Sequence, residues 1–295
     1  MQFFLLLIFV GYGKNPPAQT TRFAENMDHD HIKLPPQVLR ELKEAQNILE
    51  NPSLAARITN TIGRPIEKGF GMLPDNWNSQ IEKVTQTALI RASDGAIFSV
   101  NGRRSGKASN NLHKLGVAIT GGVGGFFGLA GLALELPAST TIMLRSIADV
   151  ARSQGEAIEE KEAKLACLEV LALGGPSTAD DSTDSGYYAV RAMMAHSISS
   201  ASRHLASRGL TEEGAPAVLR LITAVAQRFG IQVTEKAAAQ ALPLVGAASG
   251  ALINTIFIDH FQQTAKGHFT VRRLERQYGE ESIREAYARL KAGQI

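Results

Sequence analysis

The chain has 295 residues, 44% hydrophobic and 20% charged, so it carries enough apolar material for a sizeable core. A mean hydropathy of −0.06 excludes both a polytopic membrane protein and a chain that is disordered throughout. The single cysteine, Cys167, excludes an intramolecular disulfide and any multi-cysteine zinc or iron–sulfur site. Cys167 lies between leucines in a helical run, which predicts a core residue.

The net charge of +3 is localised near the end of the chain. Residues 266–291 contain seven basic and four acidic residues, so the rest of the chain is balanced. A basic segment suits anionic lipid or nucleic-acid phosphates. Here, however, acids and bases alternate at helical spacing, as in Glu280 with Arg284, which favours a solvated helical face. We expect no nucleic-acid partner.

The chain begins with an uncharged apolar run, residues 1–12, that is too short to span a bilayer. Its length suits a signal-peptide core, although no Lys or Arg precedes it. Residues 9–12 resemble the end of a bacterial lipoprotein signal, but Tyr12 stands where the acylated cysteine belongs. Residues 14–33 show no hydrophobic period and predict a disordered tether. We therefore divide the chain into a signal-like segment with its tether, 1–34, and a domain, 35–295.

Beyond the tether, apolar residues recur at helical spacing. The pattern predicts helices over 36–50, 53–62 and 66–73, followed by a long helix that Asp75 caps and that runs to Ala92. No run of alternating β-branched residues flanked by turns is present. The sequence thus predicts an all-α protein, with a single helical domain of about nine or ten helices.

Two uncharged stretches have the length of a membrane span. Residues 115–134 contain seven glycines, and residues 237–258 form a second stretch of 22 residues. Both contain pairs of small residues four positions apart, which let helices approach closely in a bilayer or in a soluble core. We expect two Gly-rich apolar helices, and the sequence leaves open whether lipid or protein surrounds them.

Nucleotide-binding and metal-binding motifs are incomplete. The glycines at 121–125 do not complete a dinucleotide-binding loop, because Phe127 occupies the third glycine position. Residues 105–109 resemble the end of a phosphate-binding loop, but Ala108 replaces the required Ser or Thr. No zinc-protease or hydrolase-elbow motif occurs. We expect no cofactor and no metal.

Polar residues next to the two Gly-rich stretches form the candidate site. Pro137 is expected in the first turn of a helix, and Arg145, Asp149, Arg152 and Glu156 follow as one stripe of alternating sign. Asn254 and Asp259 lie within and beside an apolar run, where polar groups need partners. We predict one polar cluster, either structural or a ligand or catalytic site, made of Glu135, Arg145, Asp149, Asn254 and Asp259.

Two ordered sets of residues carry a family resemblance. The first follows the Gly-rich segment and comprises Glu135-Leu136-Pro137, residues 141–149, Ala151-Arg152 and Gly155-Glu156. The second comprises Leu242-Pro243, Val245-Gly246, Gly250, Ile253-Asn254, His268-Phe269, Val271-Arg272, Leu274-Glu275 and Tyr278-Gly279. In this order the chain resembles the EcsC family, which takes its name from a bacterial ABC-transporter operon.

The resemblance implies an all-α, membrane-associated bacterial protein with no established catalytic activity. We therefore expect a membrane-associated accessory or binding protein, with membrane lipid or a membrane protein as its partner, and not an enzyme. Two alternatives stay open. One is a hydrolase that acts on a lipid or hydrophobic substrate through the polar cluster, and the other is a soluble helical scaffold. The sequence leaves the oligomeric state and the side of the membrane undecided.

Overall fold

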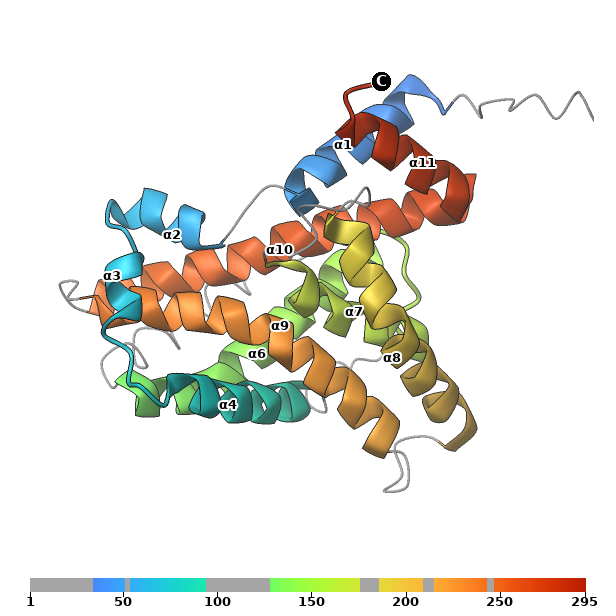
Figure 1. The fold of residues 1–295 in the computed structure, drawn as a ribbon. Coiled ribbons are helices and arrows are strands. Elements are labelled where there is room, and N and C mark those ends of the chain that lie inside the picture. Colours follow the sequence, from blue (N-terminus) through green and yellow to red (C-terminus); the bar gives the residue numbers. More distant parts are fainter. Residues whose placement is uncertain (1–33, 51–53, 94–127, 176–185, 209–214, 243–246) are drawn as a thin grey trace, which may run out of the picture. The chain divides into compact units, whose positions relative to one another are not determined.

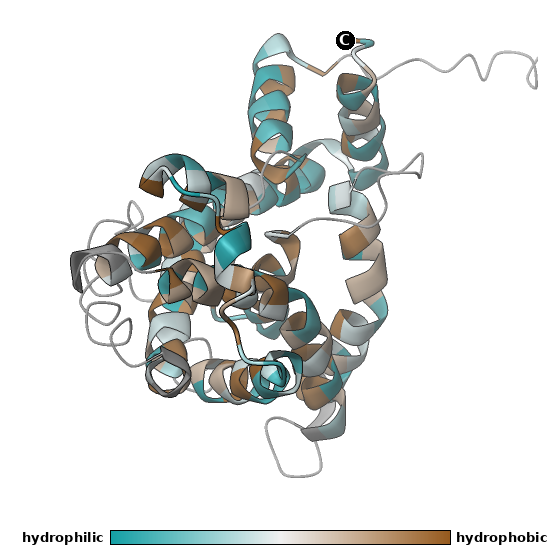
Figure 2. Ribbon diagram, turned by 60° about the vertical axis from the view of Figure 1, so that its left-hand side comes forward, coloured by the Kyte–Doolittle hydropathy of each residue, from teal (hydrophilic) through white to brown (hydrophobic). Residues whose placement is uncertain are grey.

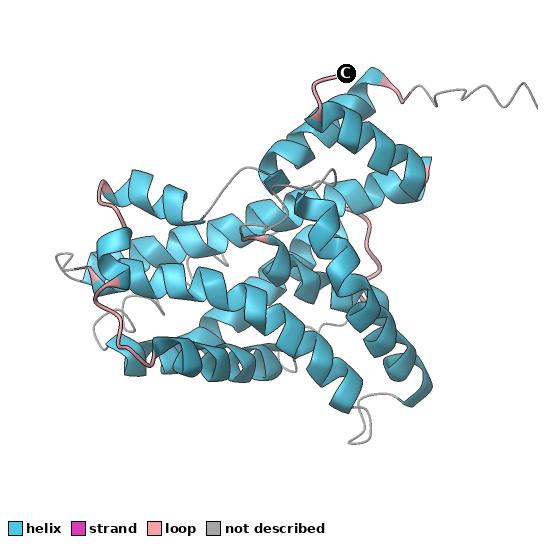
Figure 3. Ribbon diagram, in the orientation of Figure 1, coloured by secondary structure: helices cyan, strands magenta, loops and turns pink. Residues whose placement is uncertain are grey.

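The computed structural model describes residues 34–50, 54–93, 128–175, 186–208, 215–242 and 247–295. Backbone contacts divide the chain into Met1–Leu34 and Pro35–Ile295, and the second unit contains every described helix. The described residues form helices and loops with no strand (Figure 3). The predicted all-α fold is confirmed. The ten described helices are α1 (Pro36–Glu50), α2 (Leu54–Ile62), α3 (Glu67–Phe70), α4 (Trp77–Ala92), α6 (Gly128–Ser153), α7 (Lys161–Leu173), α8 (Gly186–Arg208), α9 (Ala215–Ala241), α10 (Ala247–Tyr278) and α11 (Glu280–Lys291).

Helix α10 is the axis on which the unit is built (Figure 1). It has 32 residues and is therefore about 48 Å long. It packs against α1, α2, α6, α7, α9 and α11. In the core between α9 and α10, the rings of Phe229, Phe257 and Phe261 lie with their centroids 5.2–6.0 Å apart. All three side chains are fully buried, so these aromatic contacts stabilise the central helix pair.

Helix α1 crosses α10 at a glycine. A Cβ atom on Gly267 would lie 2.9 Å from Cγ of Leu49 and 3.2 Å from the carbonyl oxygen of Ala45. A larger residue does not fit unless Leu49 or the neighbouring α1 backbone shifts, because helix backbones approach this closely only where a side chain is absent. Gly267 therefore fixes how closely α1 packs on α10.

Three tyrosines hold α8 and α11 together next to α1. Tyr187 and Tyr188 open α8, and both rings contact Tyr287 of α11 at centroid distances of 5.6 and 5.1 Å. The Tyr287 hydroxyl donates to Oε1 of Glu50 at 3.0 Å, and the Tyr287 carbonyl accepts from Nε2 of Gln46 at 2.7 Å. Both partners belong to α1, so α11 is fixed by side chains and backbone together.

Helix α6 differs from the prediction at its start. Pro137 was expected in the first turn, but α6 begins at Gly128 and Pro137 lies in its interior. Pro137 has no N–H to donate to the carbonyl of Ala133, and Ala133 lies at an exposed position on the helix. The cap predicted for α4 is also shifted, because its N-cap residue is Asn76 and not Asp75.

The two uncharged stretches do not appear as two described helices. Residues 115–127 lie outside the described part, and the rest of the first stretch opens α6. The second stretch is shared between the end of α9 and the start of α10, with 243–246 outside the description. Hydrophobic and hydrophilic positions alternate along the helices (Figure 2). None of the described helices combines the length and the hydropathy needed to cross a bilayer.

Candidate functional site

The end of α6 turns a glutamate toward the core. Gly155 has a φ of +82°, and its N–H donates to the carbonyl of Arg152 at 3.0 Å. The N–H of Glu156 reaches back to the carbonyl of Ala151 at 3.1 Å. These two bonds form a Schellman motif, in which glycine is favoured because the left-handed conformation strains other residues. As a result Glu156 leaves the helix stripe on which the sequence placed it and becomes buried.

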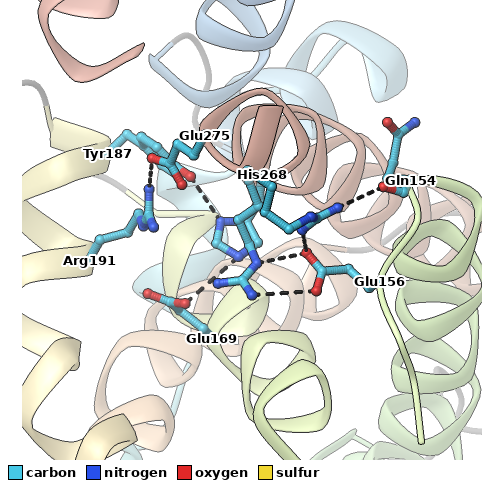
Figure 4. Close-up of polar contacts among 9 residues, drawn as sticks. Gln154, Glu156, Glu169, Tyr187, Arg191, His268 and Glu275 are labelled. Atoms are coloured by element: carbon cyan, nitrogen blue, oxygen red, sulfur yellow. Dashed lines mark hydrogen bonds and ion pairs between the residues drawn. The ribbon is translucent and has the colours of Figure 1, made fainter. Parts of the chain in front are cut away.

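Glu156 is held by two arginines of α10 (Figure 4). Arg272 donates from Nε to Oε1 at 2.9 Å and from Nη2 to Oε2 at 3.4 Å. Arg276 also bonds to Oε1, and its Nη2 donates to the carbonyl of Gln154 at 2.9 Å. Burial alone would raise the pKa of Glu156, but the hydrogen bonds and charges of the two arginines outweigh it and lower that pKa. Glu156 is therefore a stable carboxylate.

A second ion pair adjoins the first. Arg191 of α8 donates from Nη1 to Oε1 of Glu275 at 2.5 Å, and the hydroxyl of Tyr188 donates to the same oxygen at 3.0 Å. The guanidinium carbon of Arg191 also lies 5.5 Å from the ring centroid of Tyr187. We call Glu156, Arg191, Arg272, Glu275 and Arg276 the arginine–glutamate network.

The arginine–glutamate network lines a pocket of about 420 Å³, a volume typical of small-molecule sites. Four other residues line the pocket. Ala163 is buried, whereas Glu160, Glu162 and Glu280 lie at exposed positions. The wall is formed by α7, α8, α10 and the connection from α6, and Glu280 starts α11. Apart from Ala163 the lining is charged, unlike the mostly apolar lining of a typical pocket.

Behind this pocket lies a sealed group that we call the His268 cluster, made of Glu169, Tyr187 and His268. The Tyr187 hydroxyl lies 3.0 Å from Nδ1 of His268, and Nε2 of His268 faces Oε2 of Glu169 at 3.7 Å (Figure 4). Burial lowers the pKa of His268 well below its usual range and raises that of Glu169 to about 7. All three side chains are buried and none of them lines the pocket.

A third polar group lies near the starts of α6 and α10. Oε1 of Glu135 accepts from Nζ of Lys236 at 2.6 Å and from Nδ2 of Asn254 at 2.8 Å. Lys236 and Asn254 have no exposed surface, and Glu135 is 5% exposed. Burial lowers the pKa of Lys236, while the charge and hydrogen bond of Glu135 oppose this shift. We call these residues the Lys236 cluster.

The structure divides the five residues of the predicted polar cluster. Glu135 and Asn254 lie together in the Lys236 cluster. Asp149 instead binds Arg152, whose Nη1 lies 2.7 Å from its Oδ1. Asp259 pairs with Arg57 of α2, and Arg145 is exposed on α6, ten residues and about 15 Å along the helix from Glu135. The rise of α6 carries Arg145 away from Glu135, and Asp149 and Asp259 have other partners. The five predicted residues therefore do not form one group.

The predicted set omits Lys236 and the arginine–glutamate network. Lys236 directly precedes the second uncharged stretch, and a charge at the edge of an apolar helix is a local signal that it needs a partner. The pairing of Glu156 with Arg272 joins positions 116 residues apart and has no local signal. Within the described part of the chain, no three His, Cys, Asp or Glu side chains converge as metal ligands.

Comparison of the sequence with known protein families gives a match that covers most of the residues in these clusters. The sequence model of the EcsC protein family matches residues 36–274, which is most of the chain. The chain belongs to the EcsC protein family. In this EcsC protein the matched region runs from α1 almost to the end of α10 and includes Glu156, Arg191 and Arg272, whereas Glu275 and Arg276 follow it directly. Searches of the curated proteins and of the solved structures give no significant match.

Proposed function

We propose that this EcsC protein is a membrane-associated accessory protein that acts by binding and not by catalysis. The observation that carries the proposal is the separation of reactive groups from the pocket. His268 and Tyr187 are buried behind the pocket wall and do not line it. General acid–base catalysis requires the acting group within hydrogen-bond reach of the substrate. The pocket is lined by glutamates, arginines and one alanine, and its inner carboxylates, Glu156 and Glu275, are already paired with arginines, which suits binding.

The hydrolase alternative finds no support in the Lys236 cluster. Lys236 and Asn254 have no exposed surface, and the pocket described above does not include them. The thiol of Cys167 is likewise buried, and burial raises its pKa to about 12, so it carries no thiolate near neutral pH. A structural role for the Lys236 cluster accounts for its burial.

The membrane part of the proposal rests on exposed apolar side chains at one end of the unit. Leu134 is 83% exposed near the start of α6, and Leu252 is 42% exposed near the start of α10. Phe70 and Met72, at the end of α3 and just after it, are also exposed. The short helix α3 and the starts of α6 and α10 lie toward the same end of the bundle (Figure 1). Such a gathering of apolar residues is suited to a membrane surface.

A vesicle flotation assay with the full chain tests the membrane part. The vesicles contain phosphatidylcholine and phosphatidylglycerol. Each leucine that is buried in lipid contributes about 1.5–3 kcal/mol, so L134Q/L252Q is expected to lower the partition coefficient at least about tenfold. The matched control is M193Q/L219Q, which replaces two exposed apolar residues on α8 and α9. Equal partitioning of the two double variants would contradict the proposal.

A further inference from the structure

The pocket lined by the arginine–glutamate network separates its charges by depth. Its inner wall holds Arg191 and Arg272, whose side chains are 17% and 20% exposed, with their partner carboxylates Glu275 and Glu156. Its mouth holds Glu160, Glu162 and Glu280 at exposed positions, together with Arg276, whose side chain is 41% exposed and paired with Glu156. The inner wall therefore presents arginine donors, and the mouth presents three carboxylates and one arginine that is already paired with Glu156.

The inner arginines retain donors after their ion pairs are made. A guanidinium has five N–H groups. Arg272 uses Nε and Nη2 for Glu156, and Arg191 uses Nη1 for Glu275. Nη1 of Arg272 and Nη2 of Arg191 take no part in these bonds to Glu156 and Glu275. Their fork geometry matches the oxygens of a carboxylate or phosphate, so an anionic group placed on this wall has donors to meet it.

The mouth carboxylates favour the opposite charge. Glu160, Glu162 and Glu280 take no part in the ion pairs of the arginine–glutamate network. The pocket lining as a whole has five glutamates and three arginines, so a purely anionic ligand would meet an excess of negative charge. A ligand that also carries an ammonium group at the mouth removes this conflict. The inner arginines and the acidic mouth together therefore call for a ligand with one anionic group and one ammonium group.

We propose that the pocket binds a small water-soluble zwitterion, with its phosphate or carboxylate on Arg191 and Arg272 and its ammonium group between Glu160 and Glu280. This inference rests on the binding role proposed above. Leu252 and Arg272 are 20 residues apart on α10, a distance of about 30 Å along the helix. A membrane at the apolar end therefore leaves the pocket in water, which favours a soluble ligand over a lipid headgroup.

Isothermal titration calorimetry of the full chain tests the proposal. The zwitterionic probes are O-phosphoethanolamine and β-alanine, and the single-charge probes are inorganic phosphate and propylammonium. At least one zwitterion is expected to bind about tenfold more tightly than both single-charge probes, and the one that binds identifies the anionic group as phosphate or carboxylate. Binding of neither zwitterion, or equal binding of a single-charge probe, would overturn the proposal.

Two conservative double variants locate the binding. E160Q/E280Q removes two mouth charges and is expected to raise the Kd of the zwitterion about threefold to tenfold. The control E159Q/E281Q replaces adjacent exposed glutamates that do not line the pocket, and it is expected to leave the Kd unchanged. Both remove one acid from the first turn of α11, so their effects on the helix dipole match. Equal effects of the two variants would overturn the placement.

The flotation assay separates this proposal from the proposed function. If vesicle binding depends on Leu134 and Leu252 but neither zwitterion binds, the pocket assignment fails while the membrane-associated function stands. If a zwitterion binds through Glu160 and Glu280 but flotation shows no membrane binding, the pocket assignment stands and the membrane role fails.

Discussion

Nζ of Lys236 lies 2.6 Å from Oε1 of Glu135, and both side chains are buried between α6 and α9. Asn254 of α10 donates to the same oxygen at 2.8 Å, so a single carboxylate joins three helices. The ring of Phe257 adds a contact, with its centroid 4.9 Å from Nζ. A buried pair of this kind is costly to break, because the remaining charge is left in a medium of low polarity.

Replacing Lys236 alone is therefore expected to destabilise the protein strongly. K236M keeps the side-chain volume but leaves the Glu135 carboxylate without its countercharge, and we expect the free energy of unfolding to fall by about 3–5 kcal/mol. The double variant E135Q/K236M removes both charges and is expected to recover a large part of this loss. Urea denaturation measures both. A double variant as unstable as K236M would show that charge pairing is not the cause.

The glycine at the crossing of α1 and α10 gives a second prediction. The Cβ atom of G267A would lie 2.9 Å from Cγ of Leu49, and overpacking of this kind costs about 1–3 kcal/mol. The control is G230A on α9, where a Cβ atom would meet nothing within 4 Å. G230A is expected to stabilise the protein by about 0.5–1 kcal/mol, because alanine favours a helix interior over glycine. Thermal unfolding that ranks the two variants in the opposite order would refute the packing at Gly267.

The buried carboxyl of Glu169 predicts a pH dependence of stability. Burial raises its pKa from 4.5 to about 7, so the folded protein binds this proton more tightly than the unfolded chain. Its contribution to stability is therefore intact below pH 4.5 and is lost as the pH rises toward 7. At 1.36 kcal/mol for each pKa unit, the loss is about 3 kcal/mol.

E169Q removes this proton linkage. The difference in unfolding free energy, E169Q minus wild type, is expected to rise by about 3 kcal/mol between pH 4 and pH 8. Taking this difference cancels the linked protons of the other buried groups, among them His260, whose pKa burial lowers to about 4. E162Q on the exposed side of α7 is the control and should give a flat difference. If the difference in unfolding free energy for E169Q also did not change with pH, the Glu169 carboxyl would be exposed to water and not buried.

The single cysteine offers a chemical test of the core. Cys167 is fully buried in α7, and burial raises its pKa to about 12. Because the thiolate is the reactive form, iodoacetamide at pH 8 is expected to leave the folded protein unmodified and to alkylate it fully in urea. Mass spectrometry counts the adducts. Rapid alkylation of the folded protein would mean that α7 is not packed as described.

Local patterns predicted the helices well, because hydrophobic spacing is a property of neighbouring residues. The helix predicted over 36–50 has the bounds of α1, and the family resemblance was confirmed together with the all-α fold. The predicted start of α6 was wrong. Proline is common in the first turn of a helix, but here Pro137 lies inside α6, and Ala133, whose carbonyl loses its backbone partner, is at an exposed position.

The candidate site was harder to predict, because its contacts are distant along the chain. The need of Asn254 for a polar partner was visible in the sequence, and Glu135 supplies it 119 positions away. The prediction that Glu156 shares a helix face with Arg145 and Asp149 was wrong. The left-handed conformation of Gly155 follows the end of α6 and turns Glu156 toward Arg272. A periodic pattern cannot show that α6 ends at Ser153 and that the chain then turns Glu156 away from the stripe.

We propose that α10 has its Leu252 end at a membrane and its Arg272 end at a pocket for a soluble ligand. Hydrogen–deuterium exchange of the full chain, with and without vesicles and with and without O-phosphoethanolamine or β-alanine, tests it most directly. Vesicles are expected to slow exchange in α3 and at the starts of α6 and α10, and the ligand is expected to slow it near Glu156, Arg272 and Glu280. Protection of the Arg272 end by vesicles, with none at the Leu252 end, would contradict the account.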